Sequence, residues 1–199
     1  MTEIIFATKN QGKLKEIKAV LGDKYEVKSM EEIGINIDIV EDGTTFEENA
    51  IKKAEAIMKL SNKIVLSDDS GMEIDYLDGK PGVLSARFLG EDTAPEVKNE
   101  KVIEMLREAK EGERGAKFVS VIALAMKDQK PITIRGELAG EITKEPVGVN
   151  GFGYDPIFFI PEFNKTTAEL SPEEKNKISH RGKALLGIKN KLDEILKNI

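Results

Sequence analysis

The chain alternates short apolar runs with segments of helical periodicity, and this order constrains the fold more than any other feature. Residues 3–8 form a short apolar run, after which Leu14, Ile17 and Leu21 recur at helical spacing up to Gly22. Glycine is common at the position that follows a helix. Because a strand, a loop and a helix in this order are typical of α/β proteins, the sequence predicts an α/β fold.

The rest of the chain continues this mixture of elements. Further strands are predicted at residues 35–39, 63–67, 116–126 and 132–142, and further helices at residues 46–58, 94–110 and 183–197. The first two of these strands are each expected to end in an exposed turn that carries carboxylates. Neither a low-complexity linker nor a short-period repeat interrupts the order, so residues 1–199 are predicted to form a single domain.

Composition narrows the class of protein. Hydrophobic residues make up 40% of the chain and charged residues 33%, and no apolar run reaches the ~18 residues that a membrane-spanning helix needs. The N-terminus has neither a basic region before its apolar run nor a small-residue cleavage site after it, as a secretory signal would. We therefore expect a cytoplasmic protein that does not enter a membrane.

Residue counts also limit the chemistry. The chain has no cysteine and one histidine, which excludes disulfides, thiolate nucleophiles, zinc–cysteine sites and multi-histidine metal centres. Oxygen-ligated ions such as Mg²⁺ or Mn²⁺ remain. A net charge of −6 argues against a nucleic-acid partner, because binding to a phosphate backbone needs a broad basic surface.

A first group of functional residues follows the first predicted strand. The segment Thr8-Lys9-Asn10-Gln11-Gly12-Lys13 brings backbone amides, a hydroxyl and a lysine to the start of a helix, where anions are favoured. It lacks the G-x-x-x-x-G-K-[ST] pattern of a P-loop. An ordinary solvated turn is the alternative, and this segment alone does not decide between the two.

Two pairs of carboxylates come next. Glu41 and Asp42 follow one predicted strand, Asp68 and Asp69 follow another, and each pair is soon followed by glycine. Carboxylates from separate strand ends of an α/β sheet converge on one edge, and Mg²⁺ in proteins usually takes one or two of them. For any one pair taken by itself, a solvated turn is the alternative interpretation.

Two further groups lie in the C-terminal third. The segment from Gly148 to Pro156 is rich in glycine and contains Phe152 and Tyr154, and such aromatic side chains suit stacking on a base. The segment SHRGK over residues 179–183 places His180 beside an arginine at a helix start, where both could donate hydrogen bonds to a ring carbonyl or a phosphate. Aromatic residues at a strand entrance and a lone histidine are also common structural features.

Together these segments resemble the inosine triphosphatase family of non-standard purine nucleoside triphosphate pyrophosphatases. The matching motifs, in order between Ala7 and Gly182, are ATKNQGK, TTFEENAIKKA, LSDDSGMEID, GKPGVLSARF, GFGYDPIFF and EEKNKISHRGKAL. The resemblance implies an elongated mixed β-sheet with flanking helices, two lobes around a central active-site cleft, and a homodimer.

The resemblance also implies a role for individual residues. The phosphate loop falls on Thr8 to Lys13, the metal-binding glutamate on Glu41, and the catalytic, metal-associated aspartate on Asp69. Lys53 matches a lysine that faces the triphosphate, and Ser70 a serine that contacts the substrate. The base-recognising positions fall on Phe152, Gly153, Tyr154, Asp155, Lys175, His180 and Arg181.

By resemblance, the activity is Mg²⁺-dependent hydrolysis of ITP, dITP and XTP to the nucleoside monophosphate and pyrophosphate, with Mn²⁺ as a possible substitute metal. A Maf-type nucleotide pyrophosphatase with another base preference is one alternative, against which the FGYDP and SHR segments count. The other is a sensor that binds a triphosphate without cleaving it. Paired carboxylates argue against a sensor, since binding alone needs only cations.

Overall fold

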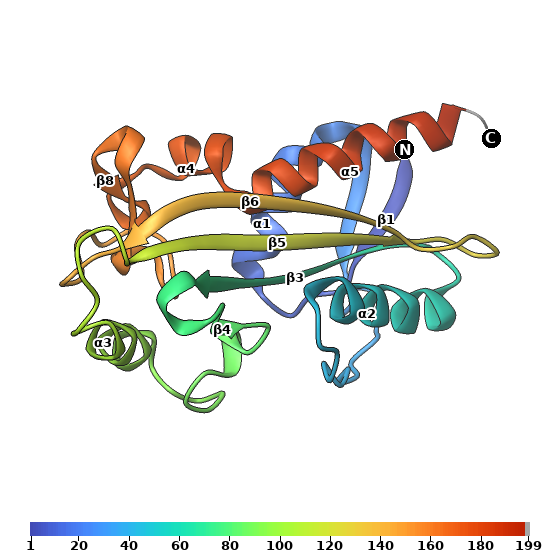
Figure 1. Ribbon diagram of the computed structural model, residues 1–199. Helices are drawn as coiled ribbons and strands as arrows, with labels where there is room; N and C mark the ends of the chain where they lie inside the picture. Colours follow the sequence, from blue (N-terminus) through green and yellow to red (C-terminus); the bar gives the residue numbers. More distant parts are fainter. Residues whose placement is uncertain (198–199) are drawn as a thin grey trace. The chain divides into compact units, whose positions relative to one another are not determined.

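Figure 1 shows a computed structural model of the protein, in which residues 1–197 are described. The strands are β1 (Thr2–Phe6), β2 (Tyr25–Ser29), β3 (Ile64–Ile74), β4 (Pro81–Gly82), β5 (Gly115–Ala125), β6 (Ile132–Ile142), β7 (Phe158–Ile160) and β8 (Lys165–Thr166). The α-helices are α1 (Gln11–Leu21), α2 (Phe46–Ser61), α3 (Pro95–Met105), α4 (Pro172–Ile178) and α5 (His180–Lys197). Short 3₁₀ turns are η1 (Gly22–Lys24), η2 (Asp75–Leu77), η3 (Ser85–Arg87), η4 (Asp155–Ile157), η5 (Pro161–Phe163) and η6 (Thr167–Glu169).

The strands form one mixed sheet. Their hydrogen-bonded order is β2-β1-β3-β5-β6-β7-β8, with β4 paired to β3. β1 runs parallel to both β2 and β3, whereas β7 is antiparallel to β6 and to β8. The predicted α/β fold is therefore confirmed.

The chain divides into two compact units. Unit 1 contains Met1–Asp69, Ser120–Gly136 and the C-terminal segment from Arg181, and unit 2 contains Ser70–Val119 and Glu137–His180. The long strands β3, β5 and β6 contribute residues to both units. Each unit has its own hydrophobic core.

In unit 1, helices cover both faces of the sheet. On one face, α1 and α5 bury Ile17 and Leu185 in a core that also contains Leu66 of β3 and Ile122 of β5. On the other face lies α2, seen below the strands in Figure 1, and the Ser67 hydroxyl of β3 donates to a carbonyl of this helix. Successive residues of a strand point to opposite faces, so neighbouring side chains of β3 meet different helices.

The core of unit 2 contains stacked aromatic rings. The ring centroids of Phe118 of β5 and Phe158 of β7 lie 4.0 Å apart, and the ring planes are nearly parallel. Stacking of this kind is favourable for aromatic pairs when the rings are offset. Val102 and Leu106, within and just after α3, are fully buried in the same core. The aromatic pair thus anchors β7, which follows the glycine-rich loop, in the core of unit 2.

Two of the predicted strands differ from the structure. Residues 35–39 form no strand, although Ile35, Ile37 and Ile39 alternate with polar residues, because no partner strand covers them and they stay partly or well exposed. The strand predicted at residues 63–67 is longer than expected: it continues to Ile74 as β3, because Met72 and Ile74 continue the buried pattern. Glu41 thus lies on a loop and the Asp68–Asp69 pair inside a strand, so the prediction that both pairs follow strand ends was wrong.

The other predicted elements agree with the structure apart from their bounds. Thr45 caps α2 with a full capping box, in which its side chain accepts from the backbone N–H of Glu48. Helix α3 ends earlier than predicted, and the guanidinium of Arg114 donates to the Leu106 carbonyl just beyond it, at 2.8 Å. Among residues 1–197, no helix is long and apolar enough to cross a membrane.

Candidate active site

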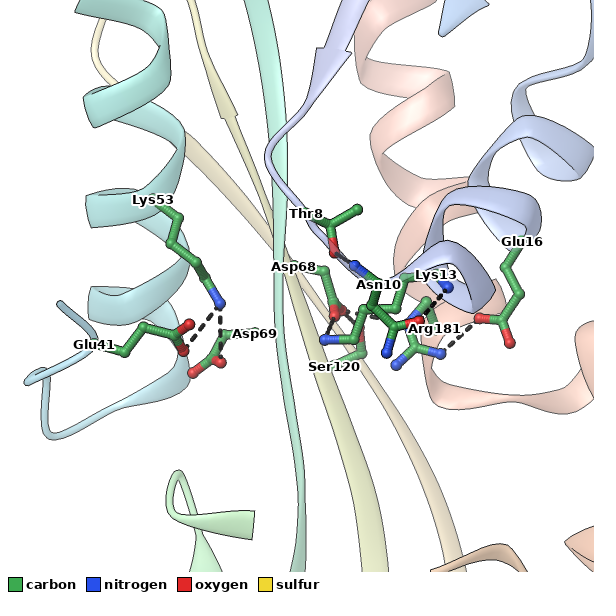
Figure 2. Close-up of polar contacts among 10 residues, drawn as sticks. All are labelled: Thr8, Asn10, Lys13, Glu16, Glu41, Lys53, Asp68, Asp69, Ser120 and Arg181. Carbon is green, nitrogen blue, oxygen red and sulfur yellow. Dashed lines mark hydrogen bonds and ion pairs between the residues drawn. The ribbon is translucent and has the colours of Figure 1, made fainter. Parts of the chain in front are cut away.

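The adjacent residues Asp68 and Asp69 of β3 lie on opposite faces of the sheet in unit 1. Figure 2 shows Asp69 turned toward α2 and Asp68 turned toward the start of α1 and α5. Both side chains are buried, with 5% of Asp69 and 3% of Asp68 exposed. The pair therefore forms two separate sites rather than one cluster.

The Asp69 site is built around a lysine of α2. Lys53 Nζ lies 3.3 Å from Asp69 Oδ1 and 3.1 Å from Glu41 Oε2, so one cation bridges two carboxylates. Because Lys53 is itself largely buried, the contact is little screened by water. The structure thus brings together Glu41 and Asp69, to which the resemblance assigns the metal, and Lys53, to which it assigns the triphosphate.

The environment of Asp69 disfavours its charged form. Burial raises its pKa to about 6, the Glu41 and Asp68 carboxylates add to the rise, and Lys53 opposes it. A carboxyl whose pKa lies close to neutrality can both hold and release a proton at ordinary pH. Asp69 is therefore suited to proton transfer as well as to metal binding.

The oxygen atoms at this site suit a hard divalent cation. Asp69 Oδ2 is buried and accepts no hydrogen bond of ordinary geometry from any described residue, and Glu41 places a second carboxylate on the same lysine. Within residues 1–197 there is no group of three or more acidic or histidine side chains that could enclose a metal. Two carboxylates nevertheless fit Mg²⁺, which keeps several water or phosphate oxygens as further ligands.

The Asp68 site carries more positive charge. Lys13 forms an ion pair with Asp68, the Ser120 hydroxyl donates to it at 2.6 Å, and Arg181 Nε lies 3.5 Å from the same oxygen, Oδ1 (Figure 2). Although burial alone would raise its pKa, Lys13 and Arg181 hold the pKa of Asp68 well below its usual range. Asp68 is therefore an anion at neutral pH that holds two cations.

Arg181 is fixed from a second side. Its Nη1 donates to Glu16 Oε2 at 2.6 Å, and both Asp68 and Glu16 raise the pKa of Arg181 against the effect of its burial. Sequence analysis missed Glu16 and Ser120. Glu16 lies three residues after Lys13 on α1, and this spacing places both on one helix face; Ser120 gave no comparable signal.

The predicted phosphate loop is ordered by its own side chains. Thr8 Oγ1 accepts from the backbone N–H of Asn10 at 3.0 Å, and Asn10 caps α1 by accepting from the N–H of Lys13 at 3.1 Å. Gln11 and Gly12 lie exposed in the first turn of the helix, while Lys9 pairs with Asp38 at 2.5 Å. A helix N-terminus with a nearby lysine is favourable for phosphate.

In unit 2, the glycine-rich loop is organised by Asp155, of which 2% is exposed. Asp155 Oδ2 accepts from the backbone N–H of Phe152 at 2.7 Å and from Lys175 Nζ at 2.6 Å, while Oδ1 accepts from the Thr167 hydroxyl at 2.8 Å. A Cβ at position 151 would lie 2.1 Å from Asp155 Oδ2, so Gly151 is needed for the loop to close on this carboxylate.

The same loop presents Phe152 at the surface. Its ring is 45% exposed and lies 4.8 Å from Lys175 Nζ, a cation–π contact. Tyr154, by contrast, is buried and donates its hydroxyl to the Ser85 carbonyl at 2.8 Å. Of the two aromatic residues predicted at this loop, Phe152 is therefore the one placed to stack on a planar ligand.

The remaining predicted site residues of unit 2 are Gly153, Ser70 and His180. Gly153 has a positive φ of 63° and its carbonyl accepts from the Asn99 side chain, Ser70 is half-buried on β3, and His180 is 7% exposed. The His180 ring lies 5.0 Å from that of Phe118. The imidazole therefore packs against an aromatic residue of the unit 2 core.

Comparison with known proteins places the chain in a family. A family model described as the Ham1 family matches residues 4–191. The chain belongs to the Ham1 family. It is 47% identical to a dITP/XTP pyrophosphatase of Bacillus licheniformis, and the match covers 98% of this chain and 100% of the relative. A dITP/XTP pyrophosphatase of Bacillus subtilis is 49% identical, with 93% of this chain and 94% of the relative covered.

Solved structures of the Ham1 family agree with the fold. A HAM1 protein from Coxiella burnetii superimposes with a TM-score of 0.91 at 43% identity, covering 98% of this chain and 100% of that one. The family resemblance predicted from the motifs is thereby confirmed.

Proposed function

We propose that this protein hydrolyses non-standard purine nucleoside triphosphates, ITP, dITP and XTP, to the nucleoside monophosphate and pyrophosphate. The observation that carries the proposal is the group of Glu41 with the buried Lys53 and Asp69, which combines hard metal-binding oxygens with a cation for phosphate. Full-length relatives named dITP/XTP pyrophosphatases support the substrate class. A Maf-type base preference and a non-catalytic sensor are less favoured.

Glu41 and Asp69 would hold Mg²⁺, which when bound neutralises charge on the pyrophosphate leaving group. Asp69 would orient the attacking water toward the α-phosphorus and accept its proton. Lys53 and Lys13, together with the N-terminus of α1, would bind the triphosphate, because an acidic protein must gather cations locally to bind a polyanion. Mn²⁺ would serve in place of Mg²⁺.

Base selection would follow from hydrogen-bond polarity. Hypoxanthine and xanthine carry a carbonyl acceptor at position 6, where adenine carries an amino donor. Lys175, His180 and Arg181 present donors, so an adenine amino group facing them would leave buried donors unsatisfied on both sides. The exposed Phe152 ring would stack on the base.

We also propose that the protein acts as a homodimer on the cytoplasmic nucleotide pool. The resemblance of its motifs to the inosine triphosphatase family supports both parts. The net charge of −6 supports free nucleotides over nucleic acid as partners.

The test is a panel of nucleoside triphosphates incubated with Mg²⁺, with products separated by chromatography. ITP, dITP and XTP should each give equal amounts of monophosphate and pyrophosphate, with ATP cleaved far more slowly. IDP and orthophosphate as first products would contradict the proposal, since the γ-phosphorus would then be attacked. Preferred cleavage of pyrimidine triphosphates would favour the Maf-type alternative, and binding without cleavage would favour a sensor.

A further inference from the structure

Asn49 is a buried polar residue of α2 that the proposed function leaves without a role. It precedes Lys53 by one helical turn, so both side chains lie on the same face of the helix. None of its surface is exposed. A buried amide is costly unless its hydrogen-bonding atoms are used, so its partners indicate what it does.

The oxygen of the amide holds the loop that carries Glu41. Asn49 Oδ1 accepts from the backbone N–H of Gly43 at 2.8 Å. The approach is so close that a Cβ at position 43 would lie 2.6 Å from Asn49 Oδ1 and 2.9 Å from the Cβ of Glu48. Because residues 35–43 have no regular secondary structure, this contact fixes a segment that the sheet does not hold.

The nitrogen of the amide faces the other carboxylate. Asn49 Nδ2 is buried and forms no hydrogen bond of ordinary geometry with any described residue. The side chain nevertheless lies within reach of Asp69 for a weaker hydrogen bond, and Lys53, one helical turn further on, pairs with the same carboxylate. One neutral side chain therefore contacts the Glu41 loop and lies beside Asp69.

We propose that Asn49 is a positioning residue that ties the Glu41 loop to α2 and so sets the separation of Glu41 from Asp69. The inference rests on the proposed function, in which these two carboxylates hold a divalent cation. An amide suits this place because it accepts from the loop and offers a donor to Asp69 without adding charge to the pair. Gly43 is the matching half of the contact, since other residues would push the loop away from the helix.

Two variants break the contact from opposite sides. Asn49→Ala removes the amide, and Gly43→Ala adds a methyl group on the loop side of the contact. Ser67→Ala is the control: it removes the 2.5 Å hydrogen bond between β3 and the Ala50 carbonyl of α2 but does not touch the Glu41 loop. All three variants lose one contact of the same helix.

Three measurements are made on each variant: hydrogen exchange of the Gly43 amide by NMR, Mn²⁺ binding without nucleotide by electron paramagnetic resonance, and steady-state hydrolysis of dITP. Asn49→Ala should speed Gly43 exchange. Both loop variants should weaken Mn²⁺ binding and kcat/KM by about 10-fold or more, the range usual for residues that orient metal ligands. Combining them should add little, because the second change finds the contact already lost.

Wild-type Mn²⁺ affinity in Gly43→Ala, or losses that simply add in the double variant, would overturn the inference. So would losses in Ser67→Ala as large as those in Asn49→Ala, since Asn49 would then act only through helix stability. A wild-type protein that binds Mn²⁺ but cleaves no triphosphate would refute the proposed function. The Mn²⁺ affinities of the variants would still show whether Asn49 positions the two carboxylates. A wild type that binds no Mn²⁺ would leave no metal pair to position and would refute the inference.

Discussion

The two faces of β3 show how neighbouring residues of one strand acquire opposite chemistry. Asp68 and Asp69 are both buried, yet the pKa of Asp68 lies well below its usual range and that of Asp69 is raised to about 6. The difference lies in the balance of charge on each face. Asp68 is paired with two cations, Lys13 and Arg181, of which Arg181 also binds Glu16, whereas Asp69 has only Lys53 and shares it with Glu41.

This comparison separates two tasks. Asp68 is a fixed anion that orders cations from α1 and α5, and Glu16 neutralises the excess positive charge. Asp69 is left short of partners, a costly arrangement that is typical of functional groups rather than structural ones. Burial alone therefore does not distinguish the two aspartates, whereas the number of cations around each one does.

The largest effect should come from Asp69→Asn. If Asp69 binds metal and positions water, kcat for dITP should fall by about 10³-fold or more, while far-ultraviolet circular dichroism stays unchanged. A folded variant with most of the wild-type kcat would assign the reaction to another group, with Glu41 the first to test.

The next largest effect should be on stability, in Asp68→Asn. This change leaves the buried Arg181 and the partly exposed Lys13 beside a neutral amide, and breaking a buried ion pair from one side costs about 3 kcal/mol or more. Urea unfolding of the metal-free protein would measure the loss. A free energy of unfolding within about 0.5 kcal/mol of wild type, the usual range for surface changes, would show that the Asp68 network contributes little.

The pH dependence of stability should reverse between the two aspartates. The raised pKa of Asp69 favours its protonated form in the folded state, so this group should lower the free energy of unfolding as pH rises from about 4 to above 6, by about 3 kcal/mol in all. The lowered pKa of Asp68 acts oppositely: its stabilisation is present above about pH 4 and is lost as pH falls further.

Urea titrations in EDTA at several pH values would test this reversal. Asp69→Asn should be more stable than wild type above pH 6, and its advantage should disappear near pH 4. A difference in the free energy of unfolding between Asp69→Asn and wild type that does not change with pH would mean that folding does not destabilise the charged form of Asp69.

Glu41, Lys53, Asp68 and Asp69 could be singled out from the sequence, but the way in which the fold arranges them could not. Helix α2 was predictable because Phe46, Ala50 and Ala54 recur at helical spacing after Thr45, which caps the helix in the structure. Glu41 was placed after a strand because Ile35, Ile37 and Ile39 alternate, but alternation needs a partner strand and this segment has none. The sequence did not predict that Asp68 and Asp69 lie on opposite faces of the sheet, because the Ser70-Gly71 pair suggested a turn rather than a continuing strand.

The residues that sequence analysis missed share a cause. Glu16, Ser120 and Asn49 are ordinary polar residues whose roles depend on partners far away in the chain, such as Arg181 for Glu16 and Gly43 for Asn49. Helical spacing places Glu16 beside Lys13 and Asn49 beside Lys53, but no local pattern identifies the distant partner of either residue. Tyr154 illustrates the converse, because an aromatic side chain on a glycine-rich loop proved to be anchored in the core through the Ser85 carbonyl.

The smallest expected effects are those of the two lysines, and their difference is the finest test of the comparison. Lys13→Ala and Lys53→Ala should each raise KM for ITP, by roughly 10-fold or about 1.4 kcal/mol, because both would contact phosphates before and during the reaction. Lys53→Ala should in addition shift the acidic limb of the kcat profile to higher pH, since it removes the cation that opposes the raised pKa of Asp69. Lys13→Ala should leave that limb in place, because Lys13 lies on the Asp68 face. Equal shifts in both variants would mean that the two faces of β3 are electrostatically one site, and an unchanged KM in either would place that lysine outside the substrate contacts.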